Sequence, residues 1–359
     1  MIDLDDKKAI LKLQGGDAVL KSIDALPKQL QQAFDESLKV NFPGEYRNVK
    51  NIIACGMGGS RFTPYIVKEL FKDKITIPYS INDDYVLPEF VDQNSLVILS
   101  SYSGNTEEPM HCGRIALKKG AKITGLAEGG QVIDFLKKIK APYYQFNPIE
   151  NPSGQPRIGF GYMVGGNLGF LFNLGLIKEN KSTIDQAISQ FPELLKDYQL
   201  EVGTENNPAK NLAQQIFQKY PYYLVSEFLT GVGNAVANQT NETAKSISSF
   251  RIIPELNHHL LEGLKFPDEH KKQAIFILFF SNLYSKPIQK RFQITKEVIE
   301  QNEINTIWIE LKGKNKVEQT FELMGLGSYM TMYLSALYGQ DPKIIPYVDY
   351  FKKKLKETS

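Results

Sequence analysis

The sequence has only two cysteines, Cys55 and Cys112, among its 359 residues. Two thiols cannot form the disulfide framework that stabilises small secreted proteins, and so few cysteines suit a reducing compartment. The first ten residues, MIDLDDKKAI, are acidic and polar where a signal peptide would be basic and then apolar. We therefore expect a cytoplasmic protein.

The sequence also lacks a dominant charge and a long apolar run. Lys and Arg number 42 against 40 Asp and Glu, so the net charge is only +2. This balance disfavours the extended basic surface that nucleic acid or an anionic membrane requires. The apolar run AIFILFF at 274–280 is much too short to cross a bilayer. We expect a small-molecule ligand and neither a nucleic-acid nor a membrane partner.

Short apolar runs alternate with helical patterns along the chain. The run NIIAC at 51–55 precedes a glycine loop, GMGGS, and then a stretch with apolar residues at helical spacing. The same order returns around SLVILS at 95–100, and again in the second half, where YYLVSEFL, QAIFILFF and INTIWIEL are the apolar runs. Alternating strands and helices predict parallel sheets covered by helices on both faces.

The length of the chain suits two domains, each with its own core. Between the two strand-and-helix series, the glycine-rich segment 158–176 has the character of a long buried helix that closes the first unit. The predicted fold class is therefore α/β, with two domains, each an αβα sandwich with a parallel sheet. We place the first domain at 1–178 and the second at 179–359.

The stretch SYSGNTEEP is rich in hydroxyl groups at the point where an apolar run ends. Ligands of parallel sheets bind where strands end and helices begin. Thr106 suits the N-cap of the next helix, with Pro109 in its first turn. The hydroxyls of Ser101, Ser103 and Thr106 are then placed to donate to a phosphate beside free backbone amides. The alternative is a simple turn and helix cap.

The sequence matches neither of two common nucleotide-binding motifs. In GMGGS, the third glycine of a G-x-G-x-x-G dinucleotide fingerprint would fall at position 61, which is Arg61. The sequence G-x-x-x-x-G-K-[ST] is absent from the chain. A hydroxyl-rich loop without lysine instead suits a phosphate that is held while the rest of the ligand reacts.

The segment from NQTNETAK to HHLLEG contains several reactive side chains. On a helix beginning near Gly233, Glu242 shares the face of Ala235, near the buried side. Desolvation would raise its proton affinity, which suits a base that takes a proton from carbon. The alternative is a solvated glutamate paired with Lys245.

The histidines of PELNHH follow residues that cannot begin a regular helix, so we expect them on a turn. Imidazole can exchange protons with a ring oxygen near neutral pH, and His258 is the candidate for that role. A metal site using His258 and Glu262 lacks a third ligand and any H-E-x-x-H sequence. We assign His259 to turn hydrogen bonding.

Two basic residues complete the candidate set. In the tail, Lys352 falls beside the apolar stripe of Val348, Phe351 and Leu355 and can turn inward, whereas a solvated role is the alternative. Arg157 follows a proline before the glycine-rich helix. A guanidinium there can stabilise a developing enediolate, and an ordinary salt bridge is the alternative.

Several of these stretches together resemble a known family. SSYSGNTEE resembles the phosphate-binding signature of the sugar isomerase (SIS) domain, and ACGMGGS resembles the preceding loop of that domain. With QPRIGFGY, NETAK, PELNHHLLEG and LYGQDPKIIPYVDYFKKKL, nearly the whole chain is similar to the bifunctional phosphoglucose/phosphomannose isomerase family, which has two SIS domains.

The resemblance implies an aldose-ketose isomerase that interconverts glucose 6-phosphate, and also mannose 6-phosphate, with fructose 6-phosphate. It implies Glu242 as base, His258 and Lys352 in ring opening, and Arg157 as stabiliser of the intermediate. The residues implied to hold phosphate are Gly59, Ser60, Ser101, Ser103 and Thr106.

The same resemblance implies a homodimer in which His258 reaches the partner's site, and no metal or organic cofactor. Lys343 and Ile344 depart from the DPTP pattern of related chains, which lies near the sugar, and can alter the choice between epimers. The alternative function is a sugar-phosphate-binding regulator without catalysis, which would lack the carboxylate, histidine and lysine that this chain retains.

Overall fold

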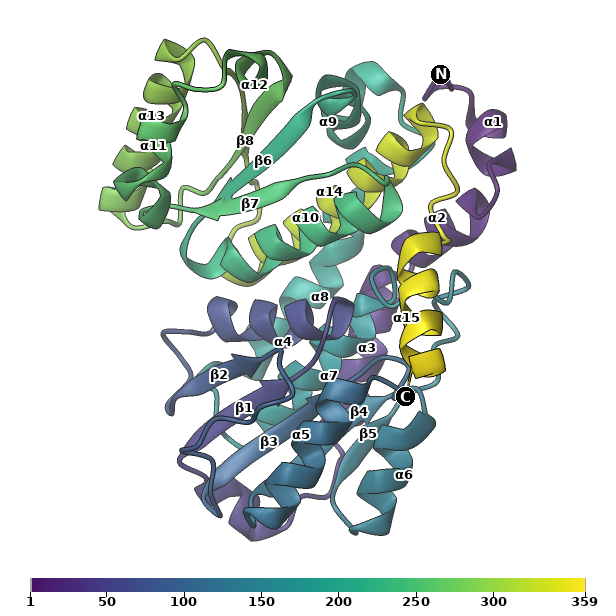
Figure 1. Ribbon diagram of the computed structural model, residues 1–359, viewed down its shortest axis with the longest axis vertical. Helices are drawn as coiled ribbons and strands as arrows, with labels where there is room; N and C mark the ends of the chain where they lie inside the picture. Colours follow the sequence, from purple (N-terminus) through teal and green to yellow (C-terminus); the bar gives the residue numbers. More distant parts are fainter. Residues whose placement is uncertain (1, 359) are drawn as a thin grey trace.

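The computed structural model describes residues 2–358 and contains two parallel sheets (Figure 1). The first has the strand order β2-β1-β3-β4-β5 and the second β7-β6-β8-β9, and every pairing is parallel. The strands are β1 Asn51–Cys55, β2 Tyr79–Asn82, β3 Ser95–Ser100, β4 Lys122–Ala127, β5 Tyr143–Gln145, β6 Tyr220–Val225, β7 Ser249–Ile252, β8 Ala274–Phe280 and β9 Asn305–Glu310. The predicted α/β class is confirmed, and the second sheet repeats the strand order of the first.

Helices cover both faces of the first sheet. A small apolar cluster lies between the sheet and the helices α5 (Glu107–Lys118) and α6 (Gly130–Lys138). On the other face, α3 (Leu26–Ser37), α4 (Gly59–Leu70) and α7 (Phe160–Asn173) pack together within a much larger cluster. The glycines of α7 allow a close approach, since a Cβ on Gly165 would meet the carbonyl oxygen of Leu30 at 2.5 Å. The buried glycine-rich helix is therefore observed as predicted.

The second sheet has its own helices. Two central ones, α10 (Thr230–Thr243) and α14 (Lys316–Leu337), pack against each other, and α14 also contacts α8 (Lys181–Leu195) and α9 (Pro208–Ile216). Apart from two helices at the start of the chain, the other elements are α11 Leu260–Gly263, α12 Asp268–Gln273, α13 Lys286–Gln301, α15 Pro346–Thr358 and the 3-10 helices η1 Gly44–Asn48, η2 Lys196–Tyr198, η3 Thr204–Asn206, η4 Glu227–Leu229 and η5 Glu255–His258.

The first residues of the chain lie against the second sheet's helices. Helix α2 (Gly16–Asp24) packs on α14, and α1 (Lys7–Lys12) precedes it at the same end of the molecule (Figure 1). The large apolar cluster includes residues of both halves. The division at residue 178 therefore remains a prediction.

Two strands and one helix boundary differ from the expected pattern. The edge strands β2 and β7 were not among the predicted strands, because each is only four residues long and mostly half-exposed, without a clear apolar run. Helix α10 begins at Thr230 instead of near Gly233. These differences leave the order of the other strands unchanged.

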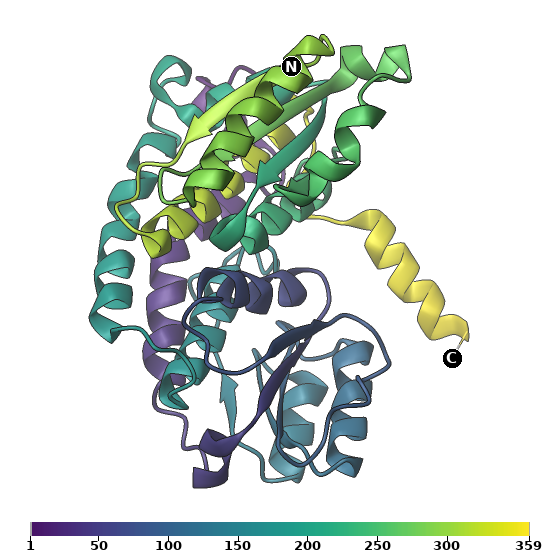
Figure 2. The ribbon, with the colours of Figure 1, turned by 90° about the vertical axis from the view of Figure 1, so that its left-hand side faces the viewer.

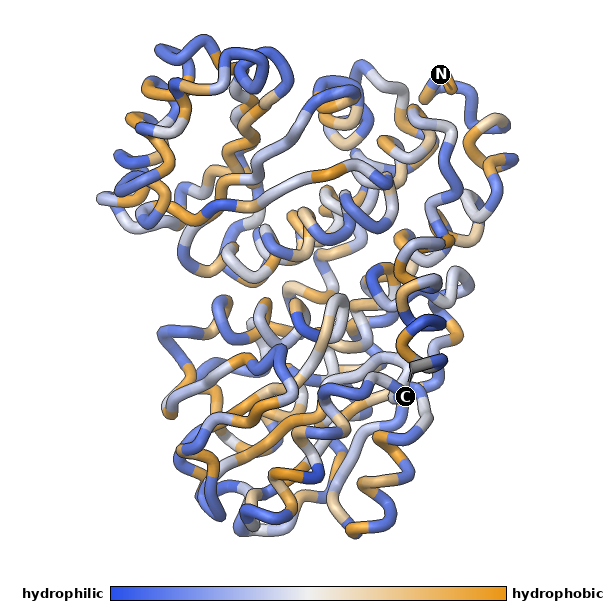
Figure 3. Tube along the Cα trace, viewed as in Figure 1, coloured by the Kyte–Doolittle hydropathy of each residue, from blue (hydrophilic) through white to orange (hydrophobic). Residues whose placement is uncertain are grey.

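The two halves meet where α10 crosses α4. Gly231 lies so close to α4 that a Cβ on it would stand 2.5 Å from the Cα of Ile66. Apolar segments follow the central strands of the first sheet, whereas polar segments lie mainly in loops and on outer helices (Figure 3). Within residues 2–358, none of the helices has both the length and the apolarity that a membrane crossing would need. The α4 and α10 contact brings the end of α10 to the loops of the first sheet.

Candidate active site

Arg157 and Glu242 meet between the two halves of the chain. Nη1 of Arg157 lies 3.5 Å from Oε2 of Glu242, with the arginine side chain 1% exposed and the glutamate side chain 28% exposed. Glu242 stands in the last turn of α10, and Arg157 lies in the turn before α7. The structure therefore brings together two of the predicted catalytic residues, which are far apart in the sequence.

Hydrogen bonds fix the guanidinium of Arg157. Nε donates to the hydroxyl of Thr243 at 3.0 Å, and Nη1 donates to the side chain of Gln155 at 2.9 Å. Nη2 donates to the carbonyls of Pro342 and Lys343 at 2.6 and 2.8 Å. The planar fork uses four N–H groups in this way, and the remaining N–H on Nη1 is available for Glu242 or a ligand oxygen.

Burial and nearby cations have opposite effects on the pKa of the Glu242 carboxylate. Burial raises the pKa of Glu242, while the charges of Arg157, Lys352 and Lys245 act in the opposite direction. A partly exposed carboxylate with a raised pKa can accept a proton from a ligand and also release it. The alternative partner, Lys245, instead donates to backbone carbonyls of Thr243 and Asp341.

Ser60 and Gly59 begin α4 beside Arg157. The hydroxyl oxygen of Ser60 accepts the backbone N–H of Tyr102 at 2.8 Å, and its carbonyl accepts the hydroxyl of Ser100 at 2.8 Å. A Cβ on Gly59 would lie 3.4 Å from the backbone nitrogen of Arg157. The two loops that follow β1 and β3 are thus joined to each other, and Arg157 lies next to them.

The loop after β3 carries the other predicted phosphate ligands. Thr106 occupies the N-cap position of α5, but its side chain makes no capping bond. Its hydroxyl accepts that of the buried Ser101 at 3.1 Å, and the hydroxyl of Ser103 accepts the N–H of Asn105 at 3.3 Å. The hydroxyls of Ser103 and Thr106 can therefore still donate to a ligand oxygen, whereas the hydroxyl of Ser101 already donates to Thr106.

Gly104 fixes the shape of this loop. Its φ of +71° is one that glycine adopts easily, and a Cβ would stand 1.8 Å from the carbonyl oxygen of Gly129. The N-terminus of α5 remains uncapped by side chains and is a favourable position for an anion.

Carboxylates occupy the corresponding loops of the second sheet. Glu227, after β6, accepts the N–H of Ser285 at 3.2 Å, where α13 begins. Glu322 accepts the N–H groups of Lys312 and Gly313, each at 2.8 Å, after β9. Internal carboxylates therefore already accept from backbone N–H groups in these loops of the second sheet.

His258 lies away from this group. It is exposed on η5, beyond the carboxyl end of β7, whereas Glu242 precedes the start of the same strand. Within one chain, the two residues therefore flank opposite ends of the short strand β7, and no contact between them is observed among the described residues. The neighbouring His259 bonds to Glu255 at 2.9 Å, in keeping with the local role expected for it.

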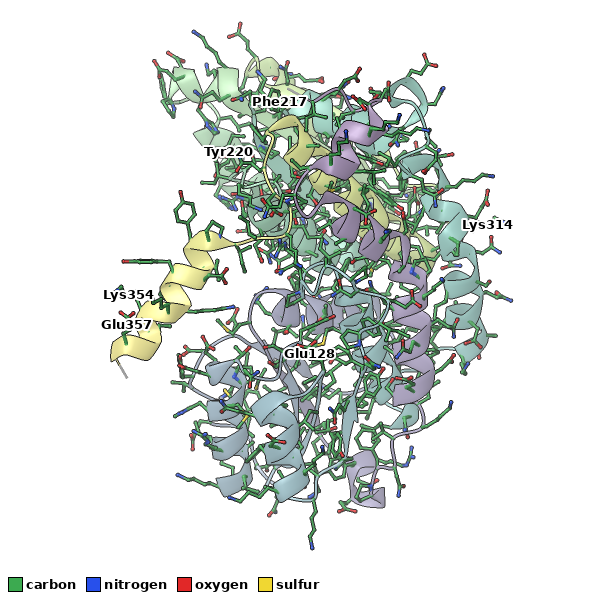
Figure 4. The ribbon with its side chains drawn as sticks, turned by 90° about the vertical axis from the view of Figure 1, so that its right-hand side faces the viewer. Glu128, Phe217, Tyr220, Lys314, Lys354 and Glu357 are labelled. Carbon is green, nitrogen blue, oxygen red and sulfur yellow. The ribbon has the colours of Figure 1, made fainter. Side chains whose placement is uncertain are left out.

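Lys352 approaches the site from α15. Its side chain is exposed, yet its charge contributes to the pKa of Glu242. Figure 2 shows α15 standing away from both halves of the chain, and Figure 4 places Lys354 and Glu357 near its outer end and Glu128 on the first unit. The structure places Lys352 on the side of the site that is open to solvent.

Sequence reasoning missed the residues that hold Arg157. Gln155, Thr243 and the carbonyls at 342 and 343 bind its guanidinium, and the amide of Gln239 donates to its backbone carbonyl at 2.8 Å. In the sequence, only their position in the stretches QPR, NET and DPK, next to the predicted site residues, could have indicated these groups. Within the described part of the chain, no three His, Cys, Asp or Glu side chains are grouped to hold a metal ion.

The comparisons with known proteins identify the family. Residues 205–355 match the family model described as the bacterial phospho-glucose isomerase C-terminal SIS domain. A bifunctional phosphoglucose/phosphomannose isomerase from Caldicellulosiruptor bescii is 32% identical over 346 residues, which is 94% of this chain and 99% of that protein. The chain belongs to the bifunctional phosphoglucose/phosphomannose isomerase family.

Solved structures agree with this family at the level of fold. A hypothetical protein from Thermus thermophilus has a TM-score of 0.76 at 14% identity and covers 98% of this chain and 93% of its own. A glucose-6-phosphate isomerase like protein from the same organism has a TM-score of 0.60 at 18% identity and covers 96% of this chain and 99% of its own. Membership of the phosphoglucose/phosphomannose isomerase family therefore accords with the observed fold.

Proposed function

We propose that this protein interconverts glucose 6-phosphate and mannose 6-phosphate with fructose 6-phosphate through an enediolate. The observation that carries the proposal is the pair of Arg157 and Glu242 beside the hydroxyl loops of the first sheet. The two aldoses differ only at C2 and give the same enediolate once the C2 proton leaves. Membership of the bifunctional isomerase family supports both the reaction and the substrates.

The phosphate binds at the loops after β1 and β3 in this proposal. Ser60, Ser103 and Thr106 donate hydroxyl protons, Gly59 allows close approach, and Ser101 supports Thr106. The helix N-termini of α4 and α5 add favourable electrostatics. Binding at one end of the sugar leaves C1 and C2 free to lie toward α10.

Glu242 acts as the base. Its carboxylate takes the proton from C2 of the aldose, the electron pair of that C–H bond forms the C1=C2 double bond, and the carbonyl π pair moves to O1. The proton then returns to C1 while the hydroxyl proton of O2 passes to O1, which leaves the C2 carbonyl of the ketose. Arg157 stabilises the negative oxygen with its remaining N–H group. The four other bonds of Arg157 keep that N–H in place throughout the reaction.

Lys352 and the histidine open the ring, and the histidine comes from a second subunit. Two observations support a homodimer with a shared site. His258 is exposed and follows β7, whereas Glu242 of its own chain precedes that strand. Helix α15 also exposes Tyr347, Tyr350 and Phe351 at 87, 63 and 60%, which a second copy could cover.

A coupled assay with each hexose 6-phosphate tests the reaction and the choice of epimer. We expect turnover of both aldoses. The variant Lys343→Thr restores the usual residue of related chains and tests whether position 343 alters the ratio of the two turnover rates. A protein that binds fructose 6-phosphate but turns over neither aldose would instead be the non-catalytic regulator.

Mixed dimers test the shared site. In a dimer of one Glu242→Gln and one His258→Asn subunit, one site receives both changes and the other receives neither. After subunit exchange of a 1:1 mixture of the two inactive variants, we expect about one quarter of wild-type activity, from the symmetry of a two-fold dimer. Activity that stays at the level of the separate variants would place His258 in the site of its own subunit.

A further inference from the structure

Lys245 lies just after the C-terminal end of α10, immediately beside the candidate site. It lies three residues after Glu242 and just beyond the C-cap, in a left-handed conformation with a φ of 54°. Its ammonium donates to the carbonyl of Thr243 at 3.2 Å and to the carbonyl of Asp341. The side chain thus links the end of α10 to a segment almost one hundred residues further along the chain.

That segment, residues 339–345, connects α14 to α15, and we name it the strap. Lys245 holds the carbonyl of Asp341, while Arg157 holds those of Pro342 and Lys343. Within the strap, the backbone N–H of Lys343 donates to the carboxylate of Asp341 at 2.7 Å. Three consecutive carbonyls are therefore bound by two cations of the site.

The strap determines where α15 stands. Figure 2 shows α15 projecting from the body, with the strap as its link to the rest of the chain, and Figure 4 shows the same helix from the opposite side. The residues at its start, Tyr347 to Phe351, are exposed. The position of Lys352 relative to Glu242 therefore depends on the bonds that hold the strap.

We propose that Lys245 is a positioning residue for the isomerase reaction, which ties the strap to α10 and so sets the place of Lys352 and the charge around Glu242. This rests on the proposed function, because it assigns Lys245 a part in the same site. Lys245 acts through the strap and through Glu242 and need not touch the substrate.

The charged groups that face Lys245 come from each surrounding segment. Arg157 precedes α7, Glu242 lies on α10 and Asp341 belongs to the strap. Burial and the charge of Arg157 lower the pKa of Lys245 to about 8, against the opposite effects of Asp341 and Glu242. The ammonium, which lowers the pKa of Glu242, is therefore lost as the pH rises through about 8.

Two variants separate charge from shape. Lys245→Gln removes the charge, whereas Lys245→Arg keeps a charge that persists at high pH. The matched control is Lys219→Gln, because Lys219 also donates to a backbone carbonyl, that of Lys272 at 2.9 Å, but outside the site. The measurements are kcat and kcat/KM for fructose 6-phosphate from pH 5 to 10, and hydrogen exchange of residues 339–358, corrected for the intrinsic rate at each pH.

For Lys245→Gln, we expect kcat to fall roughly 10-fold, because small displacements of catalytic groups are costly. The acid limb of its pH profile shifts to higher pH, because the cation that lowers the pKa of Glu242 is gone. Residues 339–358 exchange faster than in the wild type. Lys245→Arg recovers most of the activity and extends it at alkaline pH, and Lys219→Gln resembles the wild type.

Two results would overturn the proposal. One is a folded Lys245→Gln variant with the wild-type acid limb and wild-type exchange of the strap. The other is a folded Lys245→Arg variant that recovers neither activity nor protection. If the wild type turns over no hexose 6-phosphate, the proposed function fails, while the exchange measurement still decides whether Lys245 holds the strap.

Discussion

Arg157 and Glu242 form a contact of 3.5 Å across the junction of the two halves of the chain, and only the glutamate is accessible to solvent. The arginine is fixed by its neighbours, while the glutamate faces the side on which a ligand would lie. A buried cation beside a partly exposed carboxylate favours a role for the carboxylate in moving a proton and a role for the cation in stabilising charge.

Replacement of Glu242 by glutamine tests the base directly. The amide of a glutamine side chain cannot take a proton from carbon, so we expect kcat to fall by roughly 10²- to 10⁴-fold, the usual contribution of a general base. Binding of fructose 6-phosphate and the melting temperature should change little. Glu193→Gln, on α8 with an exposed side chain, is the control and should retain activity. Near wild-type turnover of a folded Glu242→Gln protein would remove Glu242 from the mechanism.

The pH dependence of kcat reports the same carboxylate. Burial raises the pKa of Glu242 above the ordinary value of a glutamate, and the base form exists only above that pKa. Activity should therefore be complete above the raised pKa and should fall as the pH decreases through it. The measurement is kcat at saturating substrate across the acid range. An acid limb at the ordinary glutamate value would contradict the effect of burial on Glu242.

Replacement of Arg157 by lysine tests the importance of the guanidinium fork. Lysine keeps the positive charge but cannot bind Thr243, Gln155 and two carbonyls of the strap at once. We expect a loss of roughly 2–4 kcal/mol in the free energy of unfolding, because several buried hydrogen bonds disappear, together with a lower kcat. Chemical denaturation and steady-state kinetics measure the two effects. The exposed Arg114 on α5, changed to lysine, is the control.

Much of the fold followed from pattern alone. The central strands β1, β3, β6 and β8 are rich in apolar residues, and a glycine or serine ends or directly follows each of them, so both their type and their parallel pairing could be predicted. The edge strands β2 and β7 carry mostly half-exposed residues, so no apolar run marked them.

The site was less accessible to sequence reasoning. Thr106 could be placed at the N-cap of α5 from local rules, but its bond to Ser101 depends on how the loop folds back. The contact of Arg157 with Glu242 depends on the crossing of α4 and α10, which local periodicity does not encode. Only the resemblance of QPR and NETAK to a family pointed to these two residues together.

Replacement of Thr106 by valine tests the phosphate loop. Valine has the same shape but cannot donate to a phosphate or accept from Ser101. We expect KM for fructose 6-phosphate to rise roughly 10-fold, as for the loss of one hydrogen bond to a charged group, with a smaller change in kcat. Thr183→Val on α8, whose hydroxyl donates to Glu179, is the control. An unchanged KM would place the phosphate elsewhere.

Replacement of Gly231 by valine tests whether the junction of the two halves positions the chemistry. A Cβ at this position would stand 2.5 Å from the Cα of Ile66, so the backbones of α10 and α4 must separate. We expect the free energy of unfolding to fall by about 1–3 kcal/mol, the usual effect of overpacking. Helix α10 carries Glu242, and α4 begins at the phosphate loop. We therefore expect kcat to fall as well, even at a temperature where the variant is fully folded, so that the loss of stability does not account for it. Gly44→Ala, where a Cβ would meet nothing within 4 Å, is the control. A Gly231→Val protein that is less stable but has full kcat would show that the spacing of α4 and α10 does not set the geometry of the reaction.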